Sequence, residues 1–201
     1  MILRSSDPSP FGRKVKITAK ILGIYDQLTV EAANTNDPAD SLRVQNPLGK
    51  LPVLILDDGR KIYDSRVICE YLDAQIDGKT LHPTNGNARW DALTLQALGD
   101  GMIDASILQV YETRMRPEEK RHADWLSYQS DKVKRALDQL EANPPALDGD
   151  LTIGHVAIAC ALGYLDLRFD GKWRSSYGGL VAWLDAFRGR VPAFDATAFK
   201  G

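Results

Sequence analysis

The sequence is poor in cysteine and histidine. Its 201 residues include two cysteines, Cys69 and Cys160, and each lies inside an apolar helical pattern. Such a pair does not predict a disulfide framework and suits a reducing compartment, so we expect a cytoplasmic protein. The three histidines do not recur at a metal-ligand spacing, and we therefore expect no metal site.

The sequence also lacks an excess of charge of one sign and any long apolar run. Its 27 acidic and 25 basic residues are mixed along the chain, without a basic arm or stripe, so we expect no nucleic-acid partner. The longest uncharged apolar run, 156–165, is too short to cross a bilayer. A charge at Arg4 interrupts the N-terminal apolar residues, so we expect neither a membrane span nor a secretory leader.

The first 76 residues alternate between strand and helix patterns. Helical spacing runs from Pro10 to Leu22 and ends at Gly23, while an Asp58-Gly59 turn joins two short apolar runs. We expect strands near 2–3, 28–30, 52–56 and 61–63, and helices at 10–22 and from 65 onward. The predicted order is βαβ, then a ββ hairpin, then a helix.

After Leu72 the pattern changes. Residues 77–87 are polar and contain glycine and proline, as is typical of a linker. Beyond it we expect only helices, at 88–115, 118–142, 152–168 and 176–189. The sequence therefore predicts an α/β domain at 1–76, the linker, and an all-α helical-bundle domain at 88–201.

A Ser-Pro-Phe-Gly turn, residues 9–12, separates the first strand from the first helix. Ser9 and Pro10 are favoured at the start of a helix, so both have a purely structural interpretation. A helix N-terminus also stabilises an anion, and a thiol held there would lose its proton more readily. The hydroxyl of Ser9 would then donate a hydrogen bond to the thiolate.

This turn occupies the place of the Cys-Pro-Tyr-Cys turn of glutaredoxins, with both sulfurs missing. The longer stretch Ser9-Pro10-Phe11-Gly12-Arg13-Lys14-Val15 resembles the start of bacterial glutathione S-transferases, in particular their YibF-like group. The resemblance implies a thioredoxin-like N-terminal domain that binds glutathione and an all-helical C-terminal domain that receives the second substrate. It implies that Ser9 is catalytic and that Phe11 contributes to the glutathione site.

Two further segments carry the same resemblance. Residues 46–54, Asn-Pro-Leu-Gly-Lys-Leu-Pro-Val-Leu, are similar to the family's N-P-x-G-K-V-P-x-L signature. The resemblance implies a cis bond before Pro52, pairing of the Leu51 backbone with the cysteinyl part of glutathione, and contact of Lys50 with the glycyl carboxylate. Ordinary alternatives are a trans proline that opens a strand and a solvated lysine.

The pair Asp64-Ser65 opens the second helix of the first half. It is a suitable N-cap in any protein. In the resembled family the matching pair holds the γ-glutamyl group, with Ser65 on the carboxylate and Asp64 on the ammonium. The order Ser9, Leu51-Pro52, Asp64-Ser65 within one βαβ–ββα pattern is more informative than any pair alone.

The helical half extends the resemblance. The stretch Asp100-Gly101-Met102-Ile103-Asp104 is similar to the family's N/D-G-x-x-D, which implies a homodimer in which Asp104 reaches glutathione in the other subunit; a solvated acid is the alternative. His155 replaces the acid of the family's T-x-x-D helix start at Thr152, where a neutral imidazole is still able to accept a hydrogen bond. Candidate lining for an electrophile comprises Met102, Ile103, Ser106, Val110, Tyr164 and Trp173.

The resemblance predicts a transferase in which glutathione, as co-substrate, attacks a small electrophile or, as a side activity, a peroxide. Detoxification would be its role. A non-catalytic glutathione- or ligand-binding module on the same scaffold is the alternative. A dithiol reductase is disfavoured, because serine and glycine stand at positions 9 and 12. Arg13 and Arg114 would attract an acidic substrate, but no spacing selects them.

Overall fold

A computed structural model describes residues 1–78 and 80–199 of the chain. The chain forms two compact units, one of residues 1–89 together with the segment from Val191, the other of residues 90–190. The expected linker includes Lys79 and the expected second domain ends at residues 200–201, and these three residues lie outside the described ones.

The first unit contains a four-stranded sheet in the order β2-β1-β3-β4. Its strands are β1 (Ile2–Ser5), β2 (Thr29–Ala32), β3 (Val53–Ile55) and β4 (Lys61–Ile62). β1 runs parallel to β2 and antiparallel to β3, and β3 runs antiparallel to β4. Buried Leu3, Val53 and Leu54 place the middle of this sheet in the core.

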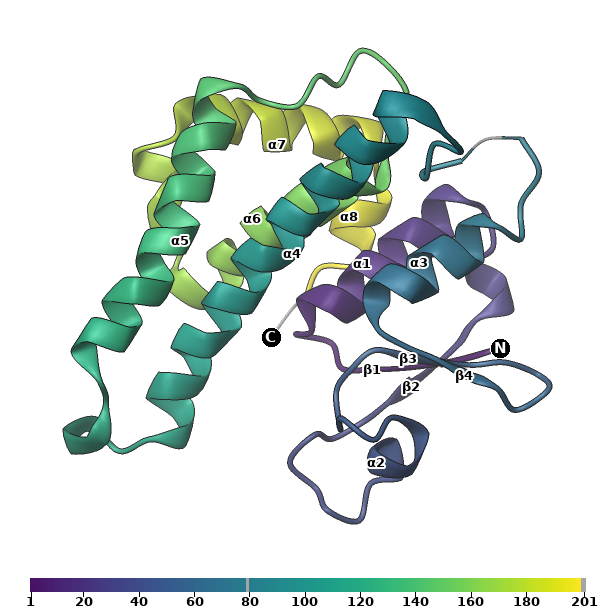
Figure 1. Ribbon diagram of the computed structural model, residues 1–201, viewed down its shortest axis with the longest axis horizontal. Helices are drawn as coiled ribbons and strands as arrows, with labels where there is room; N and C mark the ends of the chain where they lie inside the picture. Colours follow the sequence, from purple (N-terminus) through teal and green to yellow (C-terminus); the bar gives the residue numbers. More distant parts are fainter. Residues whose placement is uncertain (79, 200–201) are drawn as a thin grey trace. The chain divides into compact units, whose positions relative to one another are not determined.

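Helices cover both faces of the sheet. α1 (Pro10–Ile21) and α3 (Ser65–Asp73) pack side by side on one face, and the short α2 (Leu42–Gln45) lies on the other (Figure 1). A 3₁₀ turn, η1 (Tyr25–Gln27), precedes β2. The predicted βαβ–ββα order and thioredoxin-like fold are confirmed.

Two four-residue helices were not predicted, α2 and α8 (Ala193–Ala196). Each is too short for a 3.6-residue periodicity to be read. Tertiary contacts hold α2: Leu42 is fully buried, and the Arg4 guanidinium from β1 donates to Ser41 Oγ over 2.9 Å and to Asp40 Oδ1 over 3.0 Å. These contacts depend on residues far apart in sequence.

The segment from Val191 packs on α1. The Arg13 Nη2 donates to the Phe194 carbonyl over 2.6 Å, and the Arg13 guanidinium carbon lies 3.9 Å from the centroid of the Phe194 ring. The expected second domain runs to residue 201, but this segment belongs to the first unit. Arg13 is thus engaged in joining the two ends of the chain.

Only helices occur among the described residues of the second unit. They are α4 (Gly86–Met115), η2 (Glu118–Lys120), α5 (Ala123–Ala142), α6 (Ile153–Phe169), η3 (Lys172–Ser175) and α7 (Gly178–Arg190), α4 beginning just before the unit boundary. α6 is the core of the unit, because every residue from Ile153 to Leu165 is buried. The expected all-α bundle is confirmed. Within the described part of the chain, no helix combines the length and apolarity needed to span a membrane.

Candidate functional site

The sheet topology brings three of the predicted segments to one edge of the first unit. β1 and β4 point the same way, since each is antiparallel to β3, and both end where β3 begins. Continuing the two registers by a residue or two sets Pro52 between Ser5 and Asp64. α1 and α3 both start from this edge, so Ser9, Leu51-Pro52 and Asp64-Ser65 gather there.

Ser9 is the N-cap of α1. Its backbone is extended, with φ −73° and ψ 116°, and its Oγ accepts a hydrogen bond from the Gly12 N–H over 3.1 Å. Ser9 therefore caps the helix, as its structural interpretation predicts. The cap does not exclude a hydrogen bond from Ser9 to a thiolate, because a hydroxyl that accepts one hydrogen bond keeps its own proton to donate.

The first turn of α1 leaves a backbone donor at the same place. Pro10 has no N–H, the Gly12 N–H is bonded to Ser9 Oγ, and the Arg13 N–H donates to the Ser9 carbonyl over 2.9 Å. The Phe11 N–H has no hydrogen-bond partner among the described residues. A helix N-terminus with such a donor attracts an anion.

Gly12 fits the turn because it has no side chain. A Cβ at this position would lie 2.0 Å from the Oγ of Ser5, a residue that is itself only 1% exposed. α1 therefore begins in close contact with the end of β1. The glycine that replaces the second cysteine of a redox turn also sets this close approach.

The turn before β3 is held by the side chain of Asn46. This residue is 2% exposed, its Nδ2 donates to the Lys50 carbonyl over 2.9 Å, and its Oδ1 accepts from the Leu48 N–H over 3.0 Å. The side chain of Lys50 is exposed, and the peptide bond between Leu51 and Pro52 is cis, as the resemblance implied. Asn46 heads the signature but was not among the predicted site residues.

Asp64 and Ser65 form the start of α3. The Asp64 Oδ1 accepts from the Arg66 N–H over 2.9 Å, which makes Asp64 the N-cap, and the peptide bond before Asp64 is cis. Asp64 is exposed, whereas Ser65 is 2% exposed. The first N–H groups of α3 point along its axis toward the sheet edge, where they suit a carboxylate.

The two remaining residues of interest lie in the second unit. Asp104 is exposed on α4. His155 completes the cap of α6: its Nδ1 accepts from the Thr152 N–H over 2.9 Å, and its Nε2 faces the Ala146 carbonyl at 3.0 Å. The expectation that an imidazole serves in place of the family's acid is confirmed. Burial lowers the pKa of His155, which keeps the ring neutral.

The structure also shows where the two cysteines and the possible metal ligands lie. Cys69 and Cys160 are thiols outside any disulfide and are both fully buried, and Thr18 Oγ1 donates to Cys69 Sγ over 3.5 Å. Across residues 1–78 and 80–199, no three His, Cys, Asp or Glu side chains come together as metal ligands would. Neither cysteine is among the residues that gather at the sheet edge, and both thiols are shielded from solvent.

Each half of the chain matches a known protein-family model. Residues 8–75 match the model described as glutathione S-transferase, N-terminal domain, and residues 105–186 match glutathione S-transferase, C-terminal domain. The first match spans all three segments at the sheet edge, and the second contains Ser106, Tyr164 and Trp173.

Individual relatives resemble the chain over almost its whole length. The GST-like protein YibF of Escherichia coli (strain K12) is 34% identical over 84% of this chain and 83% of its own. A glutathione transferase family member from Pseudomonas fluorescens Pf-5, solved with bound glutathione, is 42% identical with a TM-score of 0.92, over 98% of both chains. A glutathione S-transferase from Methylobacillus flagellatus KT, also with glutathione bound, is 34% identical with a TM-score of 0.90, again over 98% of each.

Proposed function

Because this chain belongs to the glutathione S-transferase family, we propose that it binds glutathione at the sheet edge and directs the glutathione thiolate at an electrophile. The observation that carries the proposal is the meeting of the α1 N-terminus, the turn before β3 and the α3 N-terminus at that edge. The glutathione-bound structures of the Pseudomonas and Methylobacillus proteins support it.

The tripeptide is expected to lie across the three segments. Ser65 and the N-terminus of α3 hold the γ-glutamyl carboxylate, and Asp64 holds the ammonium. The backbone of Leu51, fixed beside Pro52, pairs with the cysteinyl part, and Lys50 contacts the glycyl carboxylate. Opposite charges and helix-end donors make each of these contacts electrostatically favourable.

The sulfur then lies at the start of α1, where the Ser9 hydroxyl and the Phe11 N–H are donors. The bound thiol loses its proton to solvent, and the thiolate attacks the electrophilic carbon. A carbon–sulfur bond forms while the bond to the leaving group breaks, and the leaving group departs with the electron pair. The protein supplies position and thiolate stabilisation and forms no covalent intermediate of its own.

A cytoplasmic role in detoxification, with peroxide reduction as a side activity, is part of the same proposal. With a peroxide, the thiolate attacks an oxygen, the O–O bond breaks, a sulfenic acid forms on glutathione, and the alkoxide takes a proton and departs as the alcohol. A second glutathione thiol then attacks the sulfenic sulfur and displaces its hydroxyl group, which leaves as water, to give glutathione disulfide. The buried positions of Cys69 and Cys160 suit a mechanism in which glutathione is the only thiol that reacts.

Isothermal titration calorimetry tests glutathione binding. Ser65→Ala is expected to weaken it about tenfold or more, because a hydrogen bond to a charged group is lost. Ser127→Ala, at an exposed position of α5, is the matched control and should bind like the wild type. No binding by a folded wild type would refute the proposal.

One observation favours the alternative of a non-catalytic binding module. The Ser9 Oγ is already used as the N-cap of α1, so Ser9 has a structural reason to be present. Under this alternative glutathione binds with an ordinary thiol pKa and no electrophile is conjugated. Turnover with glutathione and 1-chloro-2,4-dinitrobenzene separates the two functions.

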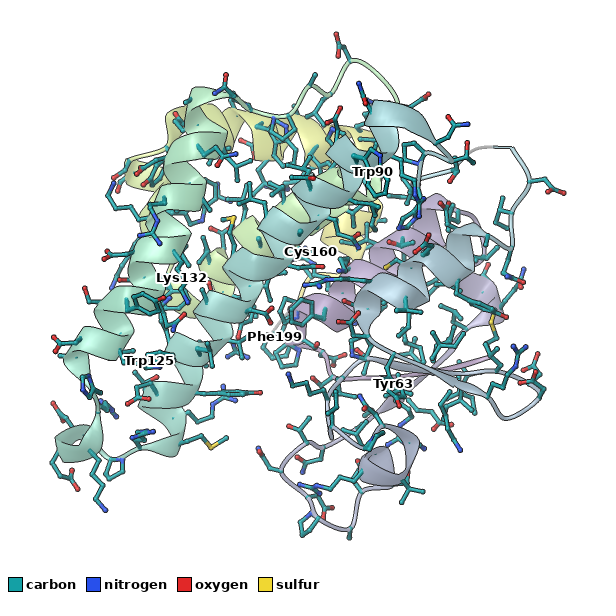
Figure 2. All side chains as sticks on the ribbon, in the orientation of Figure 1. Tyr63, Trp90, Trp125, Lys132, Cys160 and Phe199 are labelled. Carbon is teal, nitrogen blue, oxygen red and sulfur yellow. The ribbon has the colours of Figure 1, made fainter. Side chains whose placement is uncertain are left out.

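We also propose that the protein is a homodimer that uses the second unit. On α4, Leu108, Tyr111 and Met115 follow Asp104 at spacings of four, three and four residues, and they are 40%, 43% and 57% exposed. With Trp125 and Tyr128 of α5 they line a depression of about 700 Å³. Figure 2 shows Trp125 and Lys132 on the same helix, α5. An exposed apolar patch of this kind marks an interaction surface.

Sedimentation velocity tests the dimer. Leu108→Asp and Tyr111→Asp should shift it toward monomer, whereas Val44→Asp, at another exposed apolar position of 82% exposure, should not.

Asp104→Asn should weaken glutathione binding if the partner's site includes this acid. Asp91→Asn, also exposed on α4, is its control.

A further inference from the structure

The turn between α2 and β3 contains an asparagine whose side chain makes two different kinds of contact. The Asn46 Oδ1 accepts from the Leu48 N–H over 3.0 Å, and such a bond to the backbone two residues on is common for asparagine in turns. The Nδ2 donates to the Lys50 carbonyl over 2.9 Å, and this second bond is not part of that local turn. Because Asn46 is only 2% exposed, water does not compete for either bond.

Asn46 is itself fixed to the first unit. Its N–H donates to the Leu42 carbonyl over 2.7 Å, and its carbonyl accepts from the Gly49 N–H over 2.8 Å. Leu42 is buried in an apolar cluster that includes Val53 of β3, and the half-buried Leu51 packs against the same cluster. The side-chain amide of Asn46 is therefore a donor held in a fixed position relative to β3.

The bond from Asn46 to the Lys50 carbonyl sets the direction of the next backbone N–H. That carbonyl and the Leu51 N–H belong to one planar trans peptide, in which C=O and N–H point in opposite directions. Since the carbonyl is held toward the buried amide, the Leu51 N–H points away from it. This N–H has no hydrogen-bond partner within residues 1–78 and 80–199. An oriented and unused backbone donor thus lies at the sheet edge of the candidate site.

We propose that Asn46 is a positioning residue of the glutathione site, whose amide directs the Leu51 N–H at the carbonyl oxygen of the cysteinyl residue. The inference rests on the proposed binding of glutathione at this edge. In this role Asn46 acts through the Lys50–Leu51 peptide and needs no contact of its own with the ligand. It contributes to the affinity for the glutathione backbone and not to the reactivity of the thiol.

Holding this peptide in place before the ligand arrives strengthens binding. A peptide that is free to rotate has to be ordered when glutathione binds, and the entropy lost in ordering it lowers the affinity. Without the Asn46 amide, the Leu51 N–H is no longer directed at the ligand, and one neutral hydrogen bond is weakened or lost. Loss of such a bond lowers affinity by about three- to tenfold.

Two substitutions separate the two bonds that the side chain makes. Asn46→Ala removes both, whereas Asn46→Asp at neutral pH keeps an acceptor for the Leu48 N–H but has no donor for the Lys50 carbonyl. Calorimetry with glutathione should show about three- to tenfold weaker binding for both variants. Wild-type affinity in a folded Asn46→Asp variant would overturn the inference, because the bond to Leu48 alone would then be enough.

A ligand without sulfur shows whether the effect acts on the ligand backbone. γ-Glutamyl-2-aminobutyryl-glycine has the backbone of glutathione and an ethyl side chain in place of the thiol-bearing one. Asn46→Asp should weaken the binding of this ligand and of glutathione by the same factor. With 1-chloro-2,4-dinitrobenzene, KM for glutathione should rise while kcat at saturating glutathione stays within about twofold. If only glutathione is weakened, Asn46 acts on the thiol and the inference is wrong.

Glu141→Ala is the control for a general loss of stability. The Glu141 carboxylate accepts from the Gly179 and Leu180 N–H groups, each over 2.8 Å, so this substitution also removes two hydrogen bonds to the backbone, but in the second unit. Glu141→Ala should bind glutathione like the wild type, and an equal loss of affinity in this variant would overturn the inference.

The outcomes separate this inference from the proposed function. If the wild type and Asn46→Asp bind glutathione equally well, the positioning role is wrong and glutathione binding stands. If glutathione binds but no electrophile reacts, the two binding measurements still decide the inference. If the wild type does not bind glutathione, the proposed function fails and the inference fails with it.

Discussion

The Nδ1 of His155 accepts a hydrogen bond from the backbone N–H of Thr152, over 2.9 Å. Because Nδ1 is an acceptor, the ring proton of the neutral imidazole resides on Nε2, which donates to the Ala146 carbonyl at 3.0 Å. A protonated ring would carry a hydrogen on Nδ1 and break the cap. The start of the most buried helix of the protein therefore depends on a neutral histidine.

This arrangement predicts a pH dependence of stability. Burial, with the charge of Arg190, lowers the pKa of His155 below the value of about 6.5 expected in the unfolded chain. Below that pH the unfolded chain binds a proton that the folded chain does not, so the free energy of unfolding falls as the pH drops toward the folded pKa. Denaturant unfolding at several pH values between 7.5 and 5 measures the loss.

His155→Gln is the matched variant, because glutamine is able to accept from the Thr152 N–H without titrating. Its unfolding free energy should fall less than that of the wild type between pH 7.5 and 5. His82 and His122 are present in both proteins, so the difference reports His155 alone. If the unfolding free energies of the two proteins fall equally with pH, the cap does not depend on the charge of this ring.

Three substitutions at Ser9 separate its two roles. Ser9→Ala removes both the cap and the hydroxyl, and should cost about 1 kcal/mol of stability. Ser9→Asp keeps a cap acceptor but has no proton to donate, whereas Ser9→Thr keeps both. If the hydroxyl stabilises the thiolate, the thiol pKa of bound glutathione should rise by about one unit in Ser9→Ala and Ser9→Asp but not in Ser9→Thr.

Ultraviolet absorbance of the thiolate, followed against pH at saturating glutathione, gives that pKa. If the thiol pKa is unchanged in Ser9→Ala, the Phe11 N–H and the α1 N-terminus, rather than the Ser9 hydroxyl, stabilise the thiolate. The cap would then be the only function of Ser9. The free energy of unfolding of each variant, measured without glutathione, shows how far the substitution destabilises the start of α1. A change in thiol pKa that follows this loss of stability would come from fraying of the helix.

The fold could be predicted from sequence where its causes are local. Gly23 ends the first helix with a φ of 73°, and Gly59 forms the hairpin turn with a φ of 85°. Both conformations favour glycine, so the sequence signals them directly. The long helices are found equally well, because their apolar periodicity persists over several turns. α2 and α8 were missed because contacts from distant residues, Arg4 and Arg13, hold them.

The residues of the candidate site also differ in whether a local sequence pattern reveals them. Ser9, Pro52 and Asp64 stand in recognisable patterns, and the strand registers bring them to one edge as their order suggested. Asn46 heads the signature before Pro52 but was not among the predicted site residues. Its hydrogen bonds to the Lys50 carbonyl and from the Leu48 N–H become visible only in the folded turn.

A pair of glycines on α4 tests the packing on α6. At Gly99 a Cβ would approach the Ala157 backbone to 2.7 Å, whereas at Gly101 it would meet nothing within 4 Å. Gly99→Ala should therefore destabilise the protein by about 1–3 kcal/mol. Gly101→Ala should stabilise it by up to about 1 kcal/mol, because alanine is the better helix former. Equal urea midpoints for the two variants would contradict the close approach of the helices.

Asp73 anchors the chain that follows α3. Its carboxylate accepts from the Leu81 N–H over 3.0 Å, from the His82 N–H over 2.8 Å and from the hydroxyl of Thr80, and it lies 2.9 Å from His82 Nδ1. Burial alone would raise the pKa of Asp73, but hydrogen bonds from His82, Thr80 and Leu81 outweigh it and hold the pKa below its usual value.

Asp73→Asn places an amide against these donors and should cost about 3 kcal/mol at neutral pH. The exposed Asp77 supplies the control, and Asp77→Asn should unfold like the wild type. A depressed folded pKa gives stability that is present above the unfolded value of about 3.9 and is lost as the pH falls below it. The gap in unfolding free energy between the wild type and Asp73→Asn should therefore narrow below about pH 4. A gap that stays constant into acid would mean that the charge of Asp73 contributes nothing to holding this segment.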